Sequence, residues 1–330
     1  MTVVGIDISA QSFDLVSRRD GRNAKAQRFE QTAQGHARAI RHLKALKPEC
    51  IVMEATGVYY LDLAVALHEA GLAVCVINPR SFRHFAEIQL TGSKTDAIDA
   101  ALLAEYAERM TPRRWTPPPQ HCLGLRDIGR QINRLVHART QAKNRLHALT
   151  AKTSTPELLI EDEQEGIVQL DRRIARLKQA ALELIARSET LSSHFKHMST
   201  ARGMGEASTV AVLAELCSLP SGLKAAQVSR HAGLDVRLTH SGTSVNRPAR
   251  LSKAGNAYLR AALYMPAMAA IRYEPRAKAF YEALVARGKK KIQALCAVMR
   301  KYLTGLWACI KTRTPFDASA LFSDQHLRKA

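Results

Sequence analysis

The sequence lacks the features of membrane-embedded, exported or disulfide-stabilised proteins. It contains no apolar run of 18 residues, so we expect no membrane-spanning helix. Its first residues, MTVVGIDIS, have no basic segment followed by an apolar run, so we expect no signal peptide. The six cysteines are scattered and form no CxxC pair, which argues against a zinc site or a disulfide framework and favours a reducing, cytoplasmic setting.

Acidic residues are fewer than basic residues, and the difference is largest in the C-terminal part of the chain. The net charge is +20. Residues 1–110 hold 13 basic and 13 acidic residues (net 0), residues 111–200 hold 15 and 9 (net +6), and residues 201–330 hold 21 and 7 (net +14). A neutral region joined to a strongly basic one predicts that the basic region binds a polyanion, although a solvated arginine-rich surface has the same composition.

The first 110 residues have the pattern of an α/β domain. Apolar and β-branched runs predict strands at 2–9, 13–19, 24–31, 50–55 and 72–79. Apolar residues at helical spacing predict helices at 33–47, from Gly57 to about Ala70, and from about Ala97. Three strands followed by alternating helices and strands predict a mixed sheet covered by helices.

Beyond a proline-rich boundary at 111–120 the chain is predicted to be mostly helical. Apolar residues recur at heptad spacing over 125–149 and 167–184, with a connection expected at 153–166. This pattern predicts a helical hairpin or a dimerising coiled coil at 111–197. In the basic region, 198–330, we expect a polar loop at 237–255, a helix from about Asn256 and a basic amphipathic helix at 286–303.

Four carboxylates stand where an α/β domain would place a site. Asp7 and Glu54 end predicted strands, and functional groups gather at strand ends in such sheets. Asp96 and Asp99 are three residues apart, so they share one face of a helix. Hard oxygen ligands suit Mg²⁺ or Mn²⁺, and two such ions can bind the attacking and leaving oxygens of a phosphodiester.

Each carboxylate also has an ordinary structural interpretation. Asp96 could cap the helix that begins near Ala97, Asp99 could pair with Lys94, and Glu54 could cap the helix after Gly57. Taken singly, each of these is the simpler explanation. The joint pattern of two strand ends and a pair on one helix face favours a metal site.

The motifs GIDIS, VMEATG, VINP and SKTDAIDA, in this order, resemble the RNase H-like (RuvC-like) domain of DEDD transposases. These are bacterial insertion-sequence enzymes, and the family includes the pilin-gene-inverting recombinase. The C-terminal SG…LSKAGNAYLRAALYMPA resembles the transposase domain of the same family, so the resemblance covers nearly the whole chain. It implies a cytoplasmic, nucleoid-associated DNA transposase or recombinase whose Mg²⁺ or Mn²⁺ ligands map to Asp7, Glu54, Asp96 and Asp99.

The serine-rich stretch THSGTSVNRPARLSKAGN has two interpretations. From the residues alone no Ser-His-Asp spacing is found, which favours serines that contact phosphate. The resemblance instead implies that the serine of the SG motif attacks DNA and forms a phosphoserine link; it maps to Ser241, with Ser244 in reserve. Nucleic-acid contacts are expected at Arg247, Arg250, Lys253, Arg260, Lys289, Lys290 and Lys291.

The resemblance also implies partners. These are donor and target DNA, a structured bridge RNA that pairs with both, and a homodimer or homotetramer in which one protomer's acids meet another's serine. An aromatic content of 5%, with no base-stacking motif, fits sequence readout by RNA.

Three other functions are weaker. Actin-like sugar and acetate kinases need a second phosphate loop and a glycine-rich adenosine motif, which we do not find. A RuvC-like junction resolvase or nuclease would not need the serine stretch or a basic region of 130 residues. A non-catalytic nucleic-acid-binding relic would not need the intact acidic set.

Overall fold

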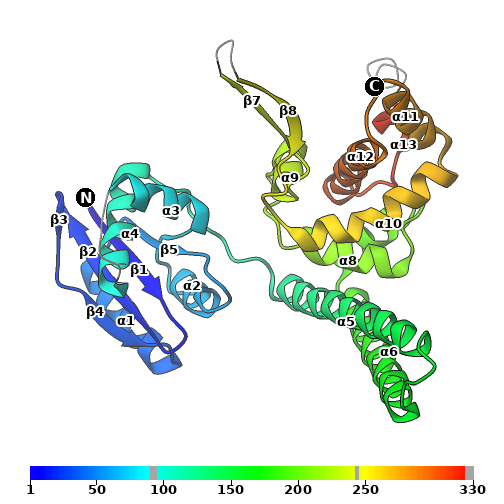
Figure 1. Cartoon of the computed structure of the whole chain (residues 1–330). Helices are drawn as coiled ribbons and strands as arrows, with labels where there is room; N and C mark the ends of the chain where they lie inside the picture. The colour runs from blue at the N-terminus through cyan, green and yellow to red at the C-terminus, as the bar shows by residue number, and fades with distance from the viewer. Residues whose placement is uncertain (90–94, 242–244, 324–330) are drawn as a thin grey trace. The chain divides into compact units, whose positions relative to one another are not determined.

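The chain forms two compact units, Met1–Pro117 and Pro118–Ala330 (Figure 1). The computed structural model describes residues 1–89, 95–241 and 245–323, with the backbone alone for 239–241 and 245–248. The observed division falls inside the proline-rich boundary predicted at 111–120. The segment 111–197, expected as a domain of its own, packs almost wholly within the second unit. Among the described residues, no helix has the length and apolar character needed to cross a bilayer.

The first unit is built on a mixed sheet, as predicted. β1 pairs antiparallel with β2, and β1, β5 and β6 are parallel. The strand order is β3-β2-β1-β5-β6, with β4 paired to β2. The strands are β1 (Thr2–Ile8), β2 (Ser12–Arg19), β3 (Arg22–Asn23), β4 (Gln27–Glu30), β5 (Cys50–Glu54) and β6 (Val74–Ile77).

Helices cover both faces of this sheet, and alternation along β1 decides which face each residue meets. Val4 and Ile6 pack in the cluster formed with α1 (Ala33–Leu46) and α2 (Tyr60–Glu69). Val3 packs in the opposite cluster with α3 (Pro79–Ile88) and α4 (Asp96–Met110). By the same alternation, Gly5 and Asp7 face α4.

The second unit begins with a helical hairpin. α5 (Gln120–Thr150) and α6 (Glu157–Ala186) run side by side and are linked by ion pairs, among them Arg139–Asp171 at 2.6 Å and Arg145–Glu163 at 2.5 Å. The connection expected at 153–166 was wrong, because helix α6 already starts after Pro156. Proline is tolerated where a helix starts, and Glu157 in the first turn complements the helix dipole.

The rest of the second unit packs around one core that includes Leu213, Leu263 and Tyr302. Its helices are α7 (Glu189–Met198), α8 (Glu206–Leu216), α9 (Ala225–His231), α10 (Ala257–Tyr273), α11 (Pro275–Ala286), α12 (Lys291–Thr312) and α13 (Ala318–Leu321). The helix predicted at 286–303 starts later, because Gly288 has φ +82° and separates α11 from α12.

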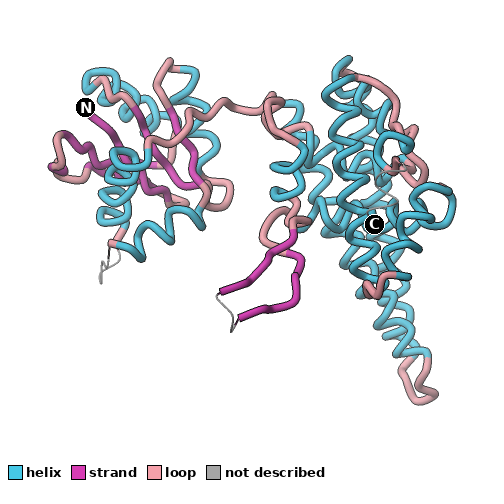
Figure 2. Tube along the Cα trace, turned by 90° about the horizontal axis from the view of Figure 1, so that it is seen from above, coloured by secondary structure: helices cyan, strands magenta, loops and turns pink. Residues whose placement is uncertain are grey.

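The polar loop predicted at 237–255 is largely a two-stranded hairpin. β7 (Val236–Ser241) pairs antiparallel with β8 (Val245–Leu251), with a register irregularity between Arg237 and Thr239. Figure 2 shows the magenta strands gathered in the first unit's sheet and in this hairpin, whereas the second unit is otherwise helical. The helix expected from about Asn256 is confirmed as α10.

Candidate functional site

Asp7, Glu54, Asp96 and Asp99 come together at one edge of the first unit. Asp7 lies next to the last residue of β1, and Glu54 is the last residue of the parallel neighbour β5. Asp96 and Asp99 lie in the first turn of α4. We refer to these four residues as the acidic edge.

Gly5 explains how α4 reaches the acidic edge. A Cβ at this position would collide with the Ala100 carbonyl oxygen and the Ala104 nitrogen. The missing side chain therefore lets the α4 backbone lie directly against β1. This close approach brings the first turn of α4 to the end of the strand that carries Asp7.

The pKa of Asp7 reports this convergence. It is raised from 3.8 to about 6; burial is the largest cause, followed by the negative charges of Asp99, Asp96 and Glu54, in that order of size. Burial and like charges both disfavour the ionised form of a carboxyl group. The four predicted carboxylates therefore share one electrostatic environment, in which a cation would be stabilised.

Two of the ordinary structural interpretations are excluded. Thr95, not Asp96, is the N-cap of α4, since its side chain accepts a hydrogen bond from the Ile98 nitrogen at 3.3 Å. Glu54 caps no helix: α2 begins only at Tyr60, and Glu54 accepts a hydrogen bond of 2.5 Å from the Thr56 hydroxyl. The suggested partner of Asp99, Lys94, lies outside the described residues.

The structure adds two residues to this edge that the sequence interpretation missed. Asp14 is opposite Asp7 in the β1–β2 ladder and is only 7% exposed, and burial raises its pKa. Arg28 donates hydrogen bonds to the Ser12 hydroxyl at 2.8 and 3.0 Å and approaches Asp96 at 3.5 Å. The available signal for Asp14 was a carboxylate flanked by Phe13 and Leu15 in an apolar strand.

The donor set suits a divalent metal ion in chemistry and charge. Carboxylate oxygens are the ligands that Mg²⁺ and Mn²⁺ prefer, and the charges of Asp99, Asp96 and Glu54 contribute, after burial, to the raised pKa of Asp7. Within residues 1–89, 95–241 and 245–323, however, no group of three or more acidic, His or Cys side chains is arranged to enclose an ion. Chemistry and charge therefore support a metal site, while the ligand geometry is not closed.

The predicted nucleophile belongs to the second unit. Ser241 is the last residue of β7 and pairs with Val245. Ser244 lies outside the described residues. Arg247 lies in β8, where its backbone pairs with Thr239. The prediction that one of these serines is the nucleophile is therefore not tested.

The turn that follows β8, Ser252–Asn256, is tightly held. Lys253 has φ +51°, and its nitrogen bonds the Gly233 carbonyl at 3.1 Å. Gly255 packs so closely that a Cβ would collide with the His231 carbonyl. The Ser252 hydroxyl donates to the Asp235 carboxylate. The motif SKAGN therefore encodes a defined turn at the base of the hairpin.

A buried ion pair anchors the end of this turn and was also missed. Glu215, 3% exposed, accepts two hydrogen bonds from Arg130 at 2.7 and 2.9 Å. It also accepts one of 2.5 Å from Asn256, whose own side-chain oxygen caps α10 at Leu259. The four residues come from α5, α8 and the start of α10, so no short motif could reveal the contact.

Three of the predicted basic residues line one cavity. Arg250, Lys253 and Lys289 surround a hollow of about 590 Å³ between the hairpin base, α11 and α12. Lys290 and Lys291 lie at the start of α12, next to it in sequence. Arg260 differs, because it is half-buried and donates a hydrogen bond of 2.8 Å to the Ala232 carbonyl.

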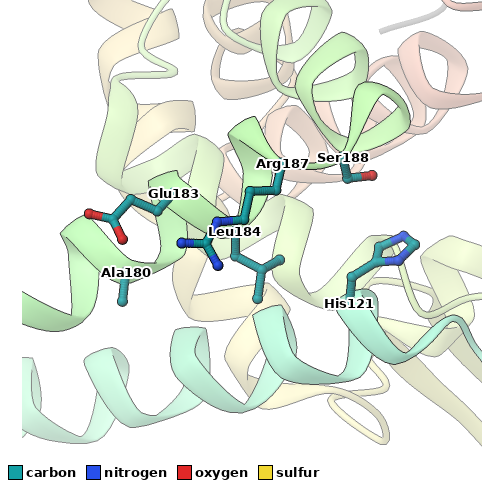
Figure 3. Close-up of a pocket in the computed structure, with 6 residues that line it drawn as sticks. All are labelled: His121, Ala180, Glu183, Leu184, Arg187 and Ser188. Atoms are coloured by element: carbon teal, nitrogen blue, oxygen red, sulfur yellow. The ribbon is translucent and has the colours of Figure 1, made fainter.

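A second hollow, of about 370 Å³, lies between α5 and the end of α6. Figure 3 shows Leu184 and Arg187 between Glu183 on one side and His121 and Ser188 on the other. The carboxylate and the imidazole therefore do not face each other. Among these lining residues we find no acid–base pair that could catalyse a reaction.

Comparison with known families finds two matches along the chain. Residues 4–154 match the family DEDD_Tnp_IS110, described as a transposase. Residues 196–282 match the family described as the transposase IS116/IS110/IS902 family. The matches cover the unit with the acidic edge and the region of the β7–β8 hairpin that carries Ser241, which we refer to as the serine hairpin, in the order that the motifs predict.

Similar proteins span the whole chain. The pilin gene-inverting protein of Moraxella bovis is 28% identical over 96% of this chain and 98% of its own length. A probable family 20 transposase of Pseudomonas aeruginosa is 26% identical over 94% of this chain and 97% of its own length. Among solved structures, T. thermophilus RuvC in complex with a Holliday junction substrate matches 35% of this chain and 99% of its own, with 19% identity and a TM-score of 0.28.

Proposed function

Because the chain belongs to the IS110-type transposase family and is a DNA recombinase or transposase, we propose that its acidic edge and its serine hairpin carry out two parts of one strand-transfer reaction. The observation that carries the proposal is the placement of Asp96, Asp99 and Glu54 beside the buried Asp7, whose pKa is raised by burial and, after it, by their three charges. Such a concentration of negative charge is typical of a site that binds divalent metal and phosphate.

Asp7, Glu54, Asp96 and Asp99 would hold Mg²⁺ or Mn²⁺. When bound, such ions polarise a phosphodiester and stabilise the charge that develops on its oxygens. The side chains themselves orient the site: Thr95 fixes the start of α4, and Thr56 holds the Glu54 carboxylate. Arg28, beside Asp96, would keep part of the edge neutral before the substrate arrives.

Ser241 would be the nucleophile, with Ser244 as the alternative. Its oxygen would form a bond to phosphorus while the bond from phosphorus to the leaving strand breaks. The proton lost by the serine ends on the hydroxyl of the released strand. The cut strand then stays attached as a phosphoserine, which a second strand end can attack to rejoin the DNA.

The acids and the serine belong to different compact units. We propose an assembly, a homodimer or homotetramer, in which one protomer's acidic edge meets another's serine hairpin. A structured RNA would pair with donor and target DNA and supply the sequence readout. The positive charge of residues 201–330 supports binding to phosphates, and the 5% aromatic content fits sequence readout by the RNA.

Mixing two inactive proteins tests this division of labour. Ser241→Ala keeps the acidic edge, and Asp99→Ala keeps the serine. We expect each alone to lack strand transfer and the mixture to recover part of it, because some composite sites then hold both. Recovery in the mixture but none with Ser241→Ala, Asp99→Ala double-variant protein would support composite sites. Strand cleavage by Ser241→Ala and Ser244→Ala proteins alone would instead indicate a metal-dependent RuvC-like nuclease without covalent serine chemistry.

A further inference from the structure

The cavity at the base of the serine hairpin combines two kinds of surface. Its walls are aliphatic: Val236 and Leu251 come from the hairpin, Leu284 from α11, and Ile292 and Ala297 from α12. Val236 is 52% exposed and Ile292 is 54% exposed, so apolar surface faces solvent at this point. Exposed apolar surface in a hollow is typical of a binding site.

The rim of the same cavity is basic. Arg250, Lys253, Lys289 and Arg300 line it, and none of its lining residues is a carboxylate. The backbone of Lys253 is held in the SKAGN turn, so the point from which this cationic side chain extends has a fixed position. The half-buried Cys296 thiol lies among them: burial raises its pKa, and the charge of Lys253 partly opposes this.

From these two surfaces we infer that the cavity receives one unpaired nucleotide of a bound nucleic acid strand, base against the aliphatic walls and phosphates against the cationic rim. This deepens the proposed function, on which it rests. The volume of about 590 Å³ lies within the range of about 300–1,000 Å³ found for small-ligand sites. A base needs an apolar surface for its face, and its phosphates need cations.

The walls point to an unpaired base rather than to readout of a duplex. Direct readout needs polar side chains that reach base edges, whereas the arginines and lysines of this cavity lie on its rim, where the phosphates would bind. The one amide in the cavity, Gln293, already accepts a hydrogen bond of 3.1 Å from the Lys290 nitrogen through its side-chain oxygen. The site would therefore accept different bases and select for an unstacked one. Its position between β8 and α12 would hold the strand beside the hairpin that carries Ser241.

Filling the cavity tests the inference. Ala297→Phe, on α12, adds a ring between the walls without changing charge. Ala308→Phe is the matched control, because Ala308 is exposed on the same helix and does not line the cavity. Binding of fluorescein-labelled oligonucleotides of one sequence is measured by anisotropy, without divalent metal, as single-stranded DNA, single-stranded RNA and duplex DNA. Thermal melts confirm that both variants fold.

We expect Ala297→Phe to weaken single-strand binding by about tenfold, because its ring occupies the space that the base would fill, with little change for duplex DNA. A larger loss for RNA than for DNA, or the reverse, identifies the strand that supplies the nucleotide. Equal affinity of both variants and wild type for every probe would overturn the inference. Because no metal is present, failure of the strand-transfer chemistry would leave these affinities unaffected.

A second measurement uses the wild-type protein and needs no variant. Alkylation of Cys296 by N-ethylmaleimide is followed by peptide mass spectrometry with and without the single-stranded oligonucleotide. We expect the oligonucleotide to slow alkylation of Cys296 and to leave Cys50, in the first unit, unchanged. An unchanged rate at Cys296 under saturating oligonucleotide would place the strand elsewhere and contradict the inference.

Discussion

The acidic edge of the first unit and the basic cavity of the second gather charge in different ways. At the acidic edge, carboxylates from β5 and α4 gather around Asp7 of β1, and burial together with their charges raises the pKa of Asp7 to about 6. Around the cavity, Arg250, Lys253, Lys289 and Arg300 are exposed and spread over a rim. We expect function to depend on each member of the first arrangement, whereas in the second a neighbouring residue can replace a lost charge.

The largest expected contrast is in strand transfer. Asp7→Asn removes a charge from the acidic edge with little change in shape. We expect the rate of strand transfer to fall by about 10³-fold or more, because removing one residue of a set that acts as a unit costs nearly as much as removing the whole set. Lys289→Ala should cost less than about tenfold, since other rim cations remain. Rates are measured on a donor–target DNA pair with the RNA present.

Asp20→Asn serves as the control for Asp7→Asn. Asp20 is exposed and has φ +48°, a conformation that Asn tolerates, so activity should be unchanged. Strand transfer by Asp7→Asn within a few-fold of wild type would remove Asp7 from the catalytic set.

The next largest contrast between the two units should be in how strongly salt weakens their binding to nucleic acid. Residues 1–110 are neutral, whereas residues 201–330 carry a net charge of +14. We expect the full chain to lose about 10²-fold or more in nucleic-acid affinity between low and moderate salt, by counterion release. A fragment of residues 1–117 should bind weakly, with a shallow slope. A fragment that retained most of the RNA affinity would contradict the charge argument.

The smallest contrast is in how the free energy of unfolding changes with pH, measured by urea unfolding of metal-free protein. The folded pKa of Asp7 is raised from 3.8 to about 6, so folding favours its protonated form. The first unit should therefore lose stability as pH rises through this range, by about 1–2 kcal/mol after allowance for partial exposure. Asp7→Asn should remove this dependence. The same change in stability between pH 4 and pH 6.5 in the wild type and in Asp7→Asn would exclude Asp7 as the source of the pH dependence.

His231 in the second unit should act in the opposite direction. Burial lowers its pKa below the ordinary 6.5, and Arg130 lowers it further, although Glu215 opposes both. Stability is therefore complete above about pH 6.5 and falls as pH drops through the lowered pKa.

Much of the acidic edge could be predicted from the sequence. Asp7 and Glu54 end apolar strands, and Asp96 and Asp99 share a helix face, so local patterns determine their positions. Asp14 could not be predicted in the same way, because its proximity to Asp7 depends on the β1–β2 register.

The second unit was less predictable. Apolar residues are sparse at 237–255: Val245, Ala249 and Leu251 fall at alternate positions of β8, but Arg247 and Pro248 interrupt the pattern, so the pairing of β7 with β8 left only a weak signal in the sequence. Glu215 and Arg130 are 85 residues apart and meet only through packing of α5 against α8. The basic residues were predicted one by one, and only the fold shows that three of them surround an apolar cavity.

Trapping and mapping the protein–DNA adduct tests the central proposal most directly. Protein incubated with donor DNA, the structured RNA and Mg²⁺ is denatured, digested and analysed by mass spectrometry for a phosphoserine-linked nucleotide. We expect the link at Ser241, its absence from Ser241→Ala and from Asp7→Asn proteins, and its persistence in Ser244→Ala. A link at Ser244 would move the nucleophile by three residues, and cleaved DNA without any covalent link would contradict the serine mechanism.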